Sequence, residues 1–264
     1  MIKGIISNKP TRLFIILAGF FITNALIAEV IGVKIFSLED TLGVSRARIP
    51  LFGGEFSFHL TAGVLLWPVV FVMTDIINEY YGPKGVRFLS FLAIGLIAFS
   101  FIIYNAAIAL KPSEFFSIGN GIDQPDNAFH GIFGQGLWII IGSIVAFLIG
   151  QVLDVFVFHR IKKVTGEKQI WLRATGSTII SQLIDSFVVL FIAFYVGKRI
   201  QTGQGDAWSM QQVMITGTGN YIYKFVIALI MTPVIYIIHG FIERYLGREK
   251  AAEMKKAAMG EEEN

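Results

Sequence analysis

The sequence contains no cysteine and few charged residues. Asp, Glu, Lys and Arg make up 16% of its 264 residues, whereas a soluble domain of this size carries about 25%. The absence of cysteine excludes a disulfide framework and a thiolate metal site. The net charge of +3 is small, and the basic residues fall between apolar runs, so we expect no nucleic-acid partner.

The short motifs of several enzyme classes are also missing. The sequence has no H-E-x-x-H, no G-x-S-x-G and no G-x-x-x-x-G-K-[ST]. Without the last of these motifs, the chain is not expected to hydrolyse ATP in the usual way. We therefore predict a protein that is not an enzyme and that binds neither a cofactor nor a metal.

Apolar residues dominate the sequence, with 54% hydrophobic residues, 24 phenylalanines and a mean hydropathy of +0.65. An apolar run of about 20 residues is long enough to span a bilayer as a helix. We predict an all-α integral membrane protein with one transmembrane domain over residues 1–240, followed by a charged tail over 241–264 that lies in solvent. The six predicted transmembrane helices cover residues 12–33, 58–79, 86–110, 134–159, 173–197 and 213–240.

The distribution of Lys and Arg predicts the orientation. If the N-terminus is cytoplasmic, 15 Lys and Arg residues fall in cytoplasmic segments and 6 fall outside. Cytoplasmic segments carry this excess in membrane proteins, so both termini are expected in the cytoplasm. The first apolar run is too long for the core of a signal peptide, and we interpret it as a retained span.

Polar side chains follow an uncharged run at residues 60–73. Asp75, Asn78 and Glu79 are spaced i, i+3 and i+4, so they share one face of a helix. A carboxylate at the end of an apolar run is costly in hydrocarbon and requires a reason. For Glu79, a helix end that meets the lipid headgroups explains the pattern as well as a functional site does, whereas Asp75 lies one turn deeper.

Other polar residues fall inside the predicted spans. The pattern Gln-x-x-Asp occurs twice and places both side chains of each pair on one face, and Lys224 follows Asn220 by four residues. At about 1.5 Å per residue, Asp185 and Lys224 fall near the membrane midplane. They form either a structural ion pair or part of a polar cavity of the kind found in transporters. The polar residues noted within these spans are Asn24, Glu29, Asn105, Gln151, Asp154, Gln182, Asp185, Asn220 and Lys224. The four histidines fall mostly at span ends or in loops, where an interfacial role is favoured over a metal site or proton relay.

Glycine and proline mark the expected irregularities. The pair at 82–83 predicts the end of a helix, and the glycines at 217–220 predict a broken helix. The outer segment 34–57 forms either a small hairpin or a plain loop. The small residues Gly142, Ala146 and Gly150 predict close helix packing, either within the chain or in a homodimer.

A set of motifs occurs along the chain at residues 66–68, 74–82, 150–154, 158–162, 171–177, 181–186 and 220–224. Together these stretches resemble the queuosine precursor transporter family, also called the vitamin uptake transporter family. The resemblance covers residues 12–240. It implies a bacterial inner-membrane importer with six helices, similar in fold to the substrate-binding subunits of energy-coupling-factor transporters, and working without a dedicated ATPase. The implied substrates are 7-deazaguanines such as 7-cyano-7-deazaguanine, salvaged for queuosine in tRNA.

The residues themselves suit such a ligand. A 7-deazaguanine presents a ring N–H beside an exocyclic amine, and one carboxylate accepts both. Amide side chains serve the carbonyl, and an aromatic side chain stacks on the ring. We expect Asp154 or Asp185, flanked by its Gln, to bind this edge, and Asp75 and Glu79 to act in a gate or in proton coupling. The candidate substrate-binding residues are Asp154, Asp185, Gln151, Gln182, Asn78, Asn220, Lys224, Trp67 and Tyr221.

Other interpretations are a substrate-binding subunit that recruits a shared ATPase, a carrier for another vitamin, an intramembrane enzyme that acts on lipid, and a purely structural subunit. The sequence lacks a nucleophile–base or metal pattern, which argues against the enzyme. The polar groups at several depths argue against a purely structural role.

Overall fold

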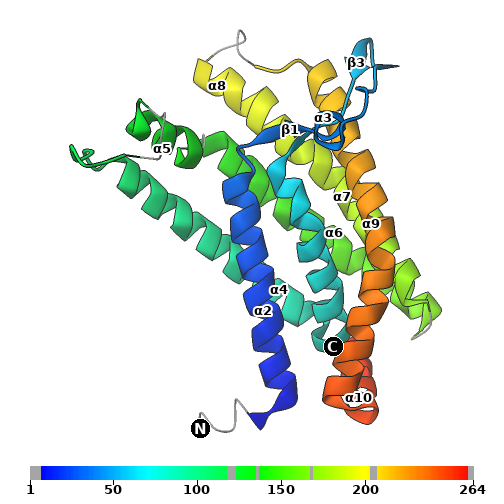
Figure 1. Ribbon diagram of the computed structural model, residues 1–264. Coiled ribbons are helices and arrows are strands. Elements are labelled where there is room, and N and C mark those ends of the chain that lie inside the picture. The colour runs from blue at the N-terminus through cyan, green and yellow to red at the C-terminus, as the bar shows by residue number, and fades with distance from the viewer. Residues whose placement is uncertain (1–6, 118–122, 135–136, 167–168, 203–206, 261–264) are drawn as a thin grey trace.

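The computed structural model describes residues 7–117, 123–134, 137–166, 169–202 and 207–260, and every structural statement below refers to these residues. Long helices form most of the molecule (Figure 1). In this part of the chain, five helical segments are long and apolar enough to cross a membrane. The prediction of an all-α integral membrane protein is confirmed. The long helices are α2 (Lys9–Ile31), α4 (Trp67–Ile108), α6 (Leu137–Thr165), α7 (Ile170–Leu190) and α9 (Met210–Leu246). Shorter helices are α3 (Leu38–Leu42), η1 (Ala62–Leu65), α5 (Pro125–Phe133), η2 (Phe191–Gly197), α8 (Lys198–Thr202) and α10 (Arg248–Gly260).

Two of the six predicted spans are the two arms of α4. The arms meet at Gly82, whose φ of 70° and ψ of −177° are not helical. This region of backbone space is almost closed to residues with a Cβ. Pro83 begins the second arm, and proline is tolerated there because the N–H groups in the first turn of a helix have no partner within the helix. The predicted break at 82–83 is confirmed, but no loop follows it: a single residue redirects the chain, and the second arm diverges from the first (Figure 1).

The predicted span 58–79 does not begin as an α-helix. Strand β1 (Ile35–Ser37) pairs antiparallel with β4 (His59–Thr61), the short 3-10 helix η1 follows, and α4 begins at Trp67. Strand β2 (Ile49–Leu51) pairs with β3 (Gly54–Phe56). The two residues between β2 and β3, Phe52 and Gly53, have φ of 49° and 78°, as a tight hairpin turn requires. Of the two interpretations of segment 34–57, the hairpin is correct.

The small residues of α6 lie against α7. A Cβ added to Gly142 would lie 3.1 Å from the carbonyl oxygen of Val189, and one added to Gly150 would lie 3.7 Å from Cβ of Asp185. Ala146 between them is buried. The predicted close packing is confirmed within the chain, and the homodimer stays a prediction.

Helix α9 is unbroken, contrary to the prediction at 217–220. Its glycines instead make room for aromatic rings. An added Cβ would lie 2.6 Å from Cδ1 of Phe187 at Gly217, and 2.5 Å from Cε2 of Phe56 at Gly219. The irregular turn is found in η2, a π-helix that continues α7. Turns of this kind often occur beside functional sites.

The charged tail packs on the protein over α10, rather than lying free in solvent as predicted. Ala251 and Ala258 are buried. Lys255 donates to Glu243 at 2.6 Å and lies 5.4 Å from the ring centroid of Tyr80 in α4. We call this the α10 end of the molecule, and the opposite one the hairpin end. The start of α2 lies at the α10 end too (Figure 1).

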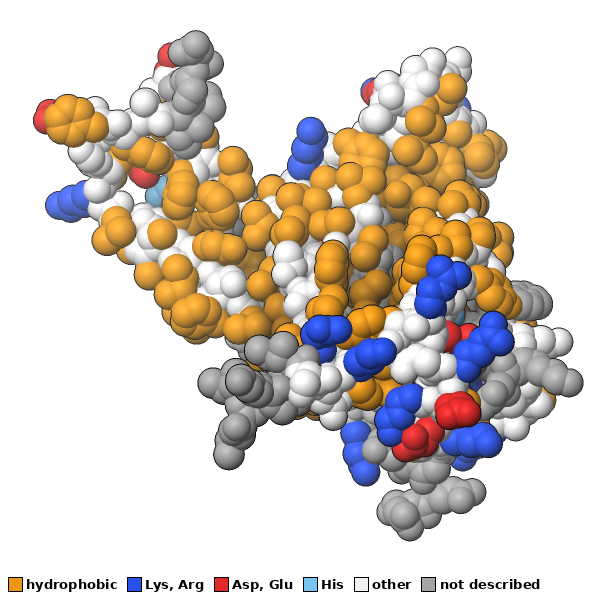
Figure 2. All heavy atoms as spheres, turned by 60° about the horizontal axis from the view of Figure 1, so that its bottom comes forward, with side chains coloured by type: hydrophobic (Ala, Val, Ile, Leu, Met, Phe, Trp, Pro, Cys, Tyr) orange, Lys and Arg blue, Asp and Glu red, His pale blue; other side chains and the backbone are white. Residues whose placement is uncertain are grey.

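Charge and hydrophobicity are segregated over the surface. Lys and Arg side chains, with a few acidic ones, gather at the α10 end, and hydrophobic side chains cover the flanks (Figure 2). Exposed apolar residues such as Phe20 on α2 and Phe88, Phe91 and Phe99 on the second arm of α4 contribute to these flanks. Such a belt is the expected surface of helices that face lipid.

Candidate functional site

A cavity of about 410 Å³ lies toward the hairpin end of the helical bundle. This volume falls within the range of small-molecule sites, which are mostly apolar with a few placed polar groups. Residues of α2, α4, α6, α7 and α9 line it, together with residues of β1, β4, η1, α5 and η2. Its polar and charged side chains, among the described residues, are Glu29, Thr61, Ser143, Asp185, Ser186, Asn220 and Lys224.

An ion pair joins two walls of this cavity. Lys224 of α9 donates to Oδ2 of Asp185 of α7. The structure thus brings together two residues that the helical rise had placed at the same depth. Both the ion pair and the cavity proposed as alternatives are present, and the pair lines the cavity.

Unpartnered polar atoms lie beside the ion pair. Gln182 is 2% exposed, and neither its Oε1 nor its Nε2 has a hydrogen-bond partner in the described part of the chain. The hydroxyl of Ser186 and Oδ1 of Asn220 lack partners in the same sense. A buried polar group without a partner costs about 1–3 kcal/mol. A ligand with matching donors and acceptors would recover this free energy.

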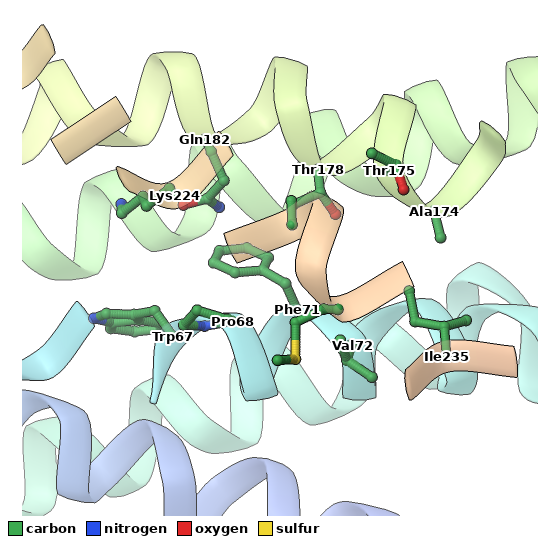
Figure 3. A pocket seen from close by; sticks show the side chains of 12 residues that line it. Trp67, Pro68, Phe71, Val72, Ala174, Thr175, Thr178, Gln182, Lys224 and Ile235 are labelled. Carbon is green, nitrogen blue, oxygen red and sulfur yellow. The ribbon is translucent and has the colours of Figure 1, made fainter. Parts of the chain in front are cut away.

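Gln182 and Lys224 line a small pocket with Trp67. In Figure 3, Gln182 of α7 and Lys224 of α9 lie on one side and Trp67 of α4 on the other. The pocket holds about 20 Å³, roughly the room of one water molecule. Trp67 and Lys224 also line the large cavity, so the two spaces share a wall. Trp67 gives this wall an aromatic surface, and its ring packs on the buried Phe147 at a centroid distance of 5.6 Å.

Tyr221 belongs to neither space. Its neighbour Asn220 lines the cavity, but Tyr221 lies about 100° further round α9. Its ring packs instead on Phe225, at a centroid distance of 6.4 Å. The structure therefore does not bring Tyr221 to the other candidate residues.

Gln151 and Asp154 lie in a separate, buried layer between α4, α6 and α7. Nε2 of Gln151 donates to Thr74 at 3.2 Å, and Ser181 donates to Oδ1 of Asp154 at 3.3 Å. Both residues are buried, and neither lines the cavity described above. The two Gln-x-x-Asp motifs therefore have different surroundings, and Asp185 is the aspartate that faces the cavity.

Asp75, Asn78 and Glu79 of α4 belong to the same buried layer and lie nearer the α10 end. Asn78 bonds to Nε2 of His159 at 2.7 Å, and Glu79 pairs with Lys162 at 3.0 Å. The side chains of Glu79 and Lys162 are each 1% exposed. Glu79 therefore does not meet lipid headgroups, and that interpretation is wrong. Asp75 is buried as well.

Sequence reasoning missed several partners in these sites. The count of Lys and Arg includes Lys162 among the cytoplasmic segments, and His159 is one of the four histidines for which an interfacial role is favoured, yet both side chains are buried. His239 is also buried, with Nδ1 3.0 Å from the hydroxyl of Tyr80. Glu29 was noted only as a polar group, but it lines the cavity and accepts a hydrogen bond from Ser143. A lone carboxylate in an apolar run was the available signal for Glu29.

Comparison with known proteins identifies the family. The family model described as "Putative vitamin uptake transporter" matches residues 61–238, which is more than half of the chain. The chain belongs to the vitamin uptake transporter family. The match contains Trp67, Asp185 and Lys224, whereas α2 with Glu29 and helix α10 lie outside it.

Individual relatives of this chain carry a more specific name. A "Probable queuosine precursor transporter" of Bacillus subtilis is 29% identical over 69% of this chain and 72% of the relative. A protein of the same name from Haemophilus influenzae is 28% identical over 86% of each chain. The "Queuosine precursor transporter" of Escherichia coli is 26% identical over 66% of this chain and 69% of the relative. No solved structure matches the chain.

Proposed function

We propose that this protein imports queuosine precursors of the 7-deazaguanine class, such as 7-cyano-7-deazaguanine, across a bacterial inner membrane. The names of its relatives support the precursor class. The observation that carries the proposal is the cavity in which Asp185, Trp67 and the unpartnered Oδ1 of Asn220 lie together, with the unpartnered amide of Gln182 in the small pocket that shares its wall. In this proposal both termini, and so the α10 end, face the cytoplasm.

The ligand chemistry matches the residues of the cavity. The ring N–H and exocyclic amine of a 7-deazaguanine donate to the carboxylate of Asp185. Asn220, which lines the cavity, would donate from its Nδ2 to the carbonyl, and the unpartnered amide of Gln182 lies one turn from Asp185 in the small pocket that shares a wall with the cavity. Trp67 offers a flat aromatic face to the ring system. Asp154 is set aside for this role, because it is fully buried and lies outside the cavity.

The buried polar layer suits a closed gate on the cytoplasmic side of the cavity. Its contacts join α4 to α6 through Asn78 with His159 and Glu79 with Lys162. These contacts must open if a ligand is to pass from the cavity to the α10 end between these helices. We assign Asp75 and Glu79 to this gate or to proton coupling. If Asp75→Asn or Glu79→Gln takes up precursor as the wild type does at every pH tested, the residue changed in that variant has no role in the gate or in proton coupling.

The test measures queuosine in tRNA. The protein is expressed in a bacterium that can neither make nor import 7-cyano-7-deazaguanine, and that compound is supplied at low concentration. We expect queuosine to be restored by the wild type and by Tyr221→Phe, whose ring lies outside the cavity, and to be lost in Asp185→Asn. Each variant is checked for insertion in the membrane.

Two results would contradict the proposal. Full restoration by Asp185→Asn would remove the assigned binding residue. If the inserted wild type restored nothing from 7-cyano-7-deazaguanine, 7-aminomethyl-7-deazaguanine or queuine, the substrate class would be wrong.

The family description favours a second candidate, a carrier or substrate-binding subunit for another vitamin-like molecule. A subunit of that kind would recruit a shared ATPase module. Copurification of an ATPase pair with this chain would support it, and uptake by the chain alone in proteoliposomes would argue against it.

A further inference from the structure

The α2 side of the cavity carries a second carboxylate. Glu29 is 8% exposed, lines the cavity, and accepts a hydrogen bond at Oε1 from Ser143 of α6. Asp185 and Lys224 come from other helices, α7 and α9. A ligand that fills the cavity therefore meets carboxylates on different helices.

The charges of the lining favour a positive ligand group. Among the described residues, the charged side chains that line the cavity are Glu29, Asp185 and Lys224. Asp185 and Lys224 form an ion pair and largely cancel. When Glu29 is ionised, the lining therefore carries a net negative charge. Carboxylates within membrane helices are costly and mark pathways for substrates or ions, and a charge-assisted hydrogen bond from a cation offsets this cost.

The 7-deazaguanine precursors differ in charge at one position. They share the edge that donates to a single carboxylate, but the substituent at position 7 is a neutral nitrile in one compound and an aminomethyl group in another. The aminomethyl group is an aliphatic amine, which is protonated at neutral pH as a lysine is. A site with one carboxylate for the shared edge and another for the substituent would distinguish the two compounds.

We propose that Glu29, held by Ser143, binds the protonated aminomethyl group, so that the protein prefers 7-aminomethyl-7-deazaguanine to 7-cyano-7-deazaguanine. This inference rests on the proposed function, because it assumes a 7-deazaguanine in the cavity. Glu29 then determines specificity, whereas Asp185 serves the edge that both compounds share.

The test compares the dissociation constants of the two compounds for purified protein in lipid nanodiscs. We expect the wild type to bind the aminomethyl compound about tenfold more tightly or better, as a charge-assisted hydrogen bond provides. Glu29→Gln should remove most of this preference by weakening the binding of the aminomethyl compound, while the binding of the nitrile changes little. Ser143→Ala keeps the carboxylate and should reduce the preference by a smaller factor. Asp185→Asn is the control, the same carboxylate-to-amide change at the residue assigned to the shared edge, and it should weaken the binding of both compounds by the same factor.

The outcomes separate the inference from the function on which it rests. If both compounds bind the wild type and the nitrile binds as tightly or more tightly, the inference is wrong. An equal loss of both compounds in Glu29→Gln would also overturn it, because Glu29 would then act in folding or ion coupling. If Glu29→Gln does not fold, the wild-type preference and its reduction in Ser143→Ala still decide. Binding of neither compound to the wild type would instead reject the proposed function.

Discussion

The ion pair of Glu79 and Lys162 gives the sharpest test of the buried polar layer. Both side chains are 1% exposed and lie 3.0 Å apart, and Lys162 also reaches the backbone oxygen of Glu79 at 3.5 Å. Removing one partner of a buried pair leaves an uncompensated charge and costs about 3–5 kcal/mol. For a chain of this size, such a loss corresponds to a decrease in Tm on the order of 10 °C. We therefore expect Glu79→Gln and Lys162→Met each to lower the Tm by this amount.

The double variant provides the control. Replacing both charges by neutral groups of similar shape is often close to neutral in stability, so the double variant should recover most of the lost Tm. The measurement is thermal unfolding followed by size-exclusion fluorescence, in one detergent for all four proteins. A decrease of only a few degrees in the single variants would refute the reasoning. So would a double variant whose loss equals the sum of the single losses, because the two effects would then be independent.

The same proteins test the gate. A folded double variant without the ion pair should take up precursor with an altered rate or pH dependence if the pair closes the pathway. Uptake identical to that of the wild type at every pH would leave Glu79 and Lys162 with a structural role alone.

Three further predictions concern local geometry and pH. Gly82→Ala should abolish the folded protein in gel filtration, because the backbone conformation of Gly82 is almost closed to residues with a Cβ. The control is Gly95→Ala, which should be neutral or stabilising because a Cβ added at Gly95 would have no heavy atom within 4 Å. Equal behaviour of the two variants would contradict this reasoning. Gly217→Ala should lower the Tm measurably, since an added Cβ would lie 2.6 Å from a ring carbon of α7; an unchanged Tm would show that the ring moves freely. At the hairpin end, the hydrogen bond from Arg46 holds the pKa of Asp40 below its ordinary value of 3.8. The stabilisation it provides is present above the unfolded-state pKa and is lost as pH falls through the lowered folded-state pKa. Limited proteolysis of the segment around Asp40 should therefore increase in the wild type only below about pH 3.8. In Asp40→Asn, the segment should already be cleaved faster at higher pH. A wild type cleaved equally at pH 6 and pH 3 would exclude a stabilising role for the pair of Asp40 and Arg46.

The membrane class and the approximate positions of the long helices follow from the amino-acid sequence. Runs of about 20 apolar residues are stable in lipid only when their backbone groups bond within the segment, so length and hydropathy were sufficient. Helical periodicity also predicted which residues share a face, as with Asn220 and Lys224, which both line the cavity. Gly82 followed by Pro83 identified the break in α4, because glycine can adopt the positive φ that other residues avoid and proline cannot donate the N–H that would continue the preceding helix.

Which polar face meets the cavity follows only from the packing of the helices. The two Gln-x-x-Asp motifs are identical as patterns, yet Asp185 lines the cavity whereas Asp154 is enclosed. The partners of Asn78 and Glu79, His159 and Lys162, lie about 80 residues further along the chain. A periodic pattern reports only which side chains of one helix share a face. Which neighbouring helix covers that face, and whether it leaves a cavity there, depends on how all the helices pack together.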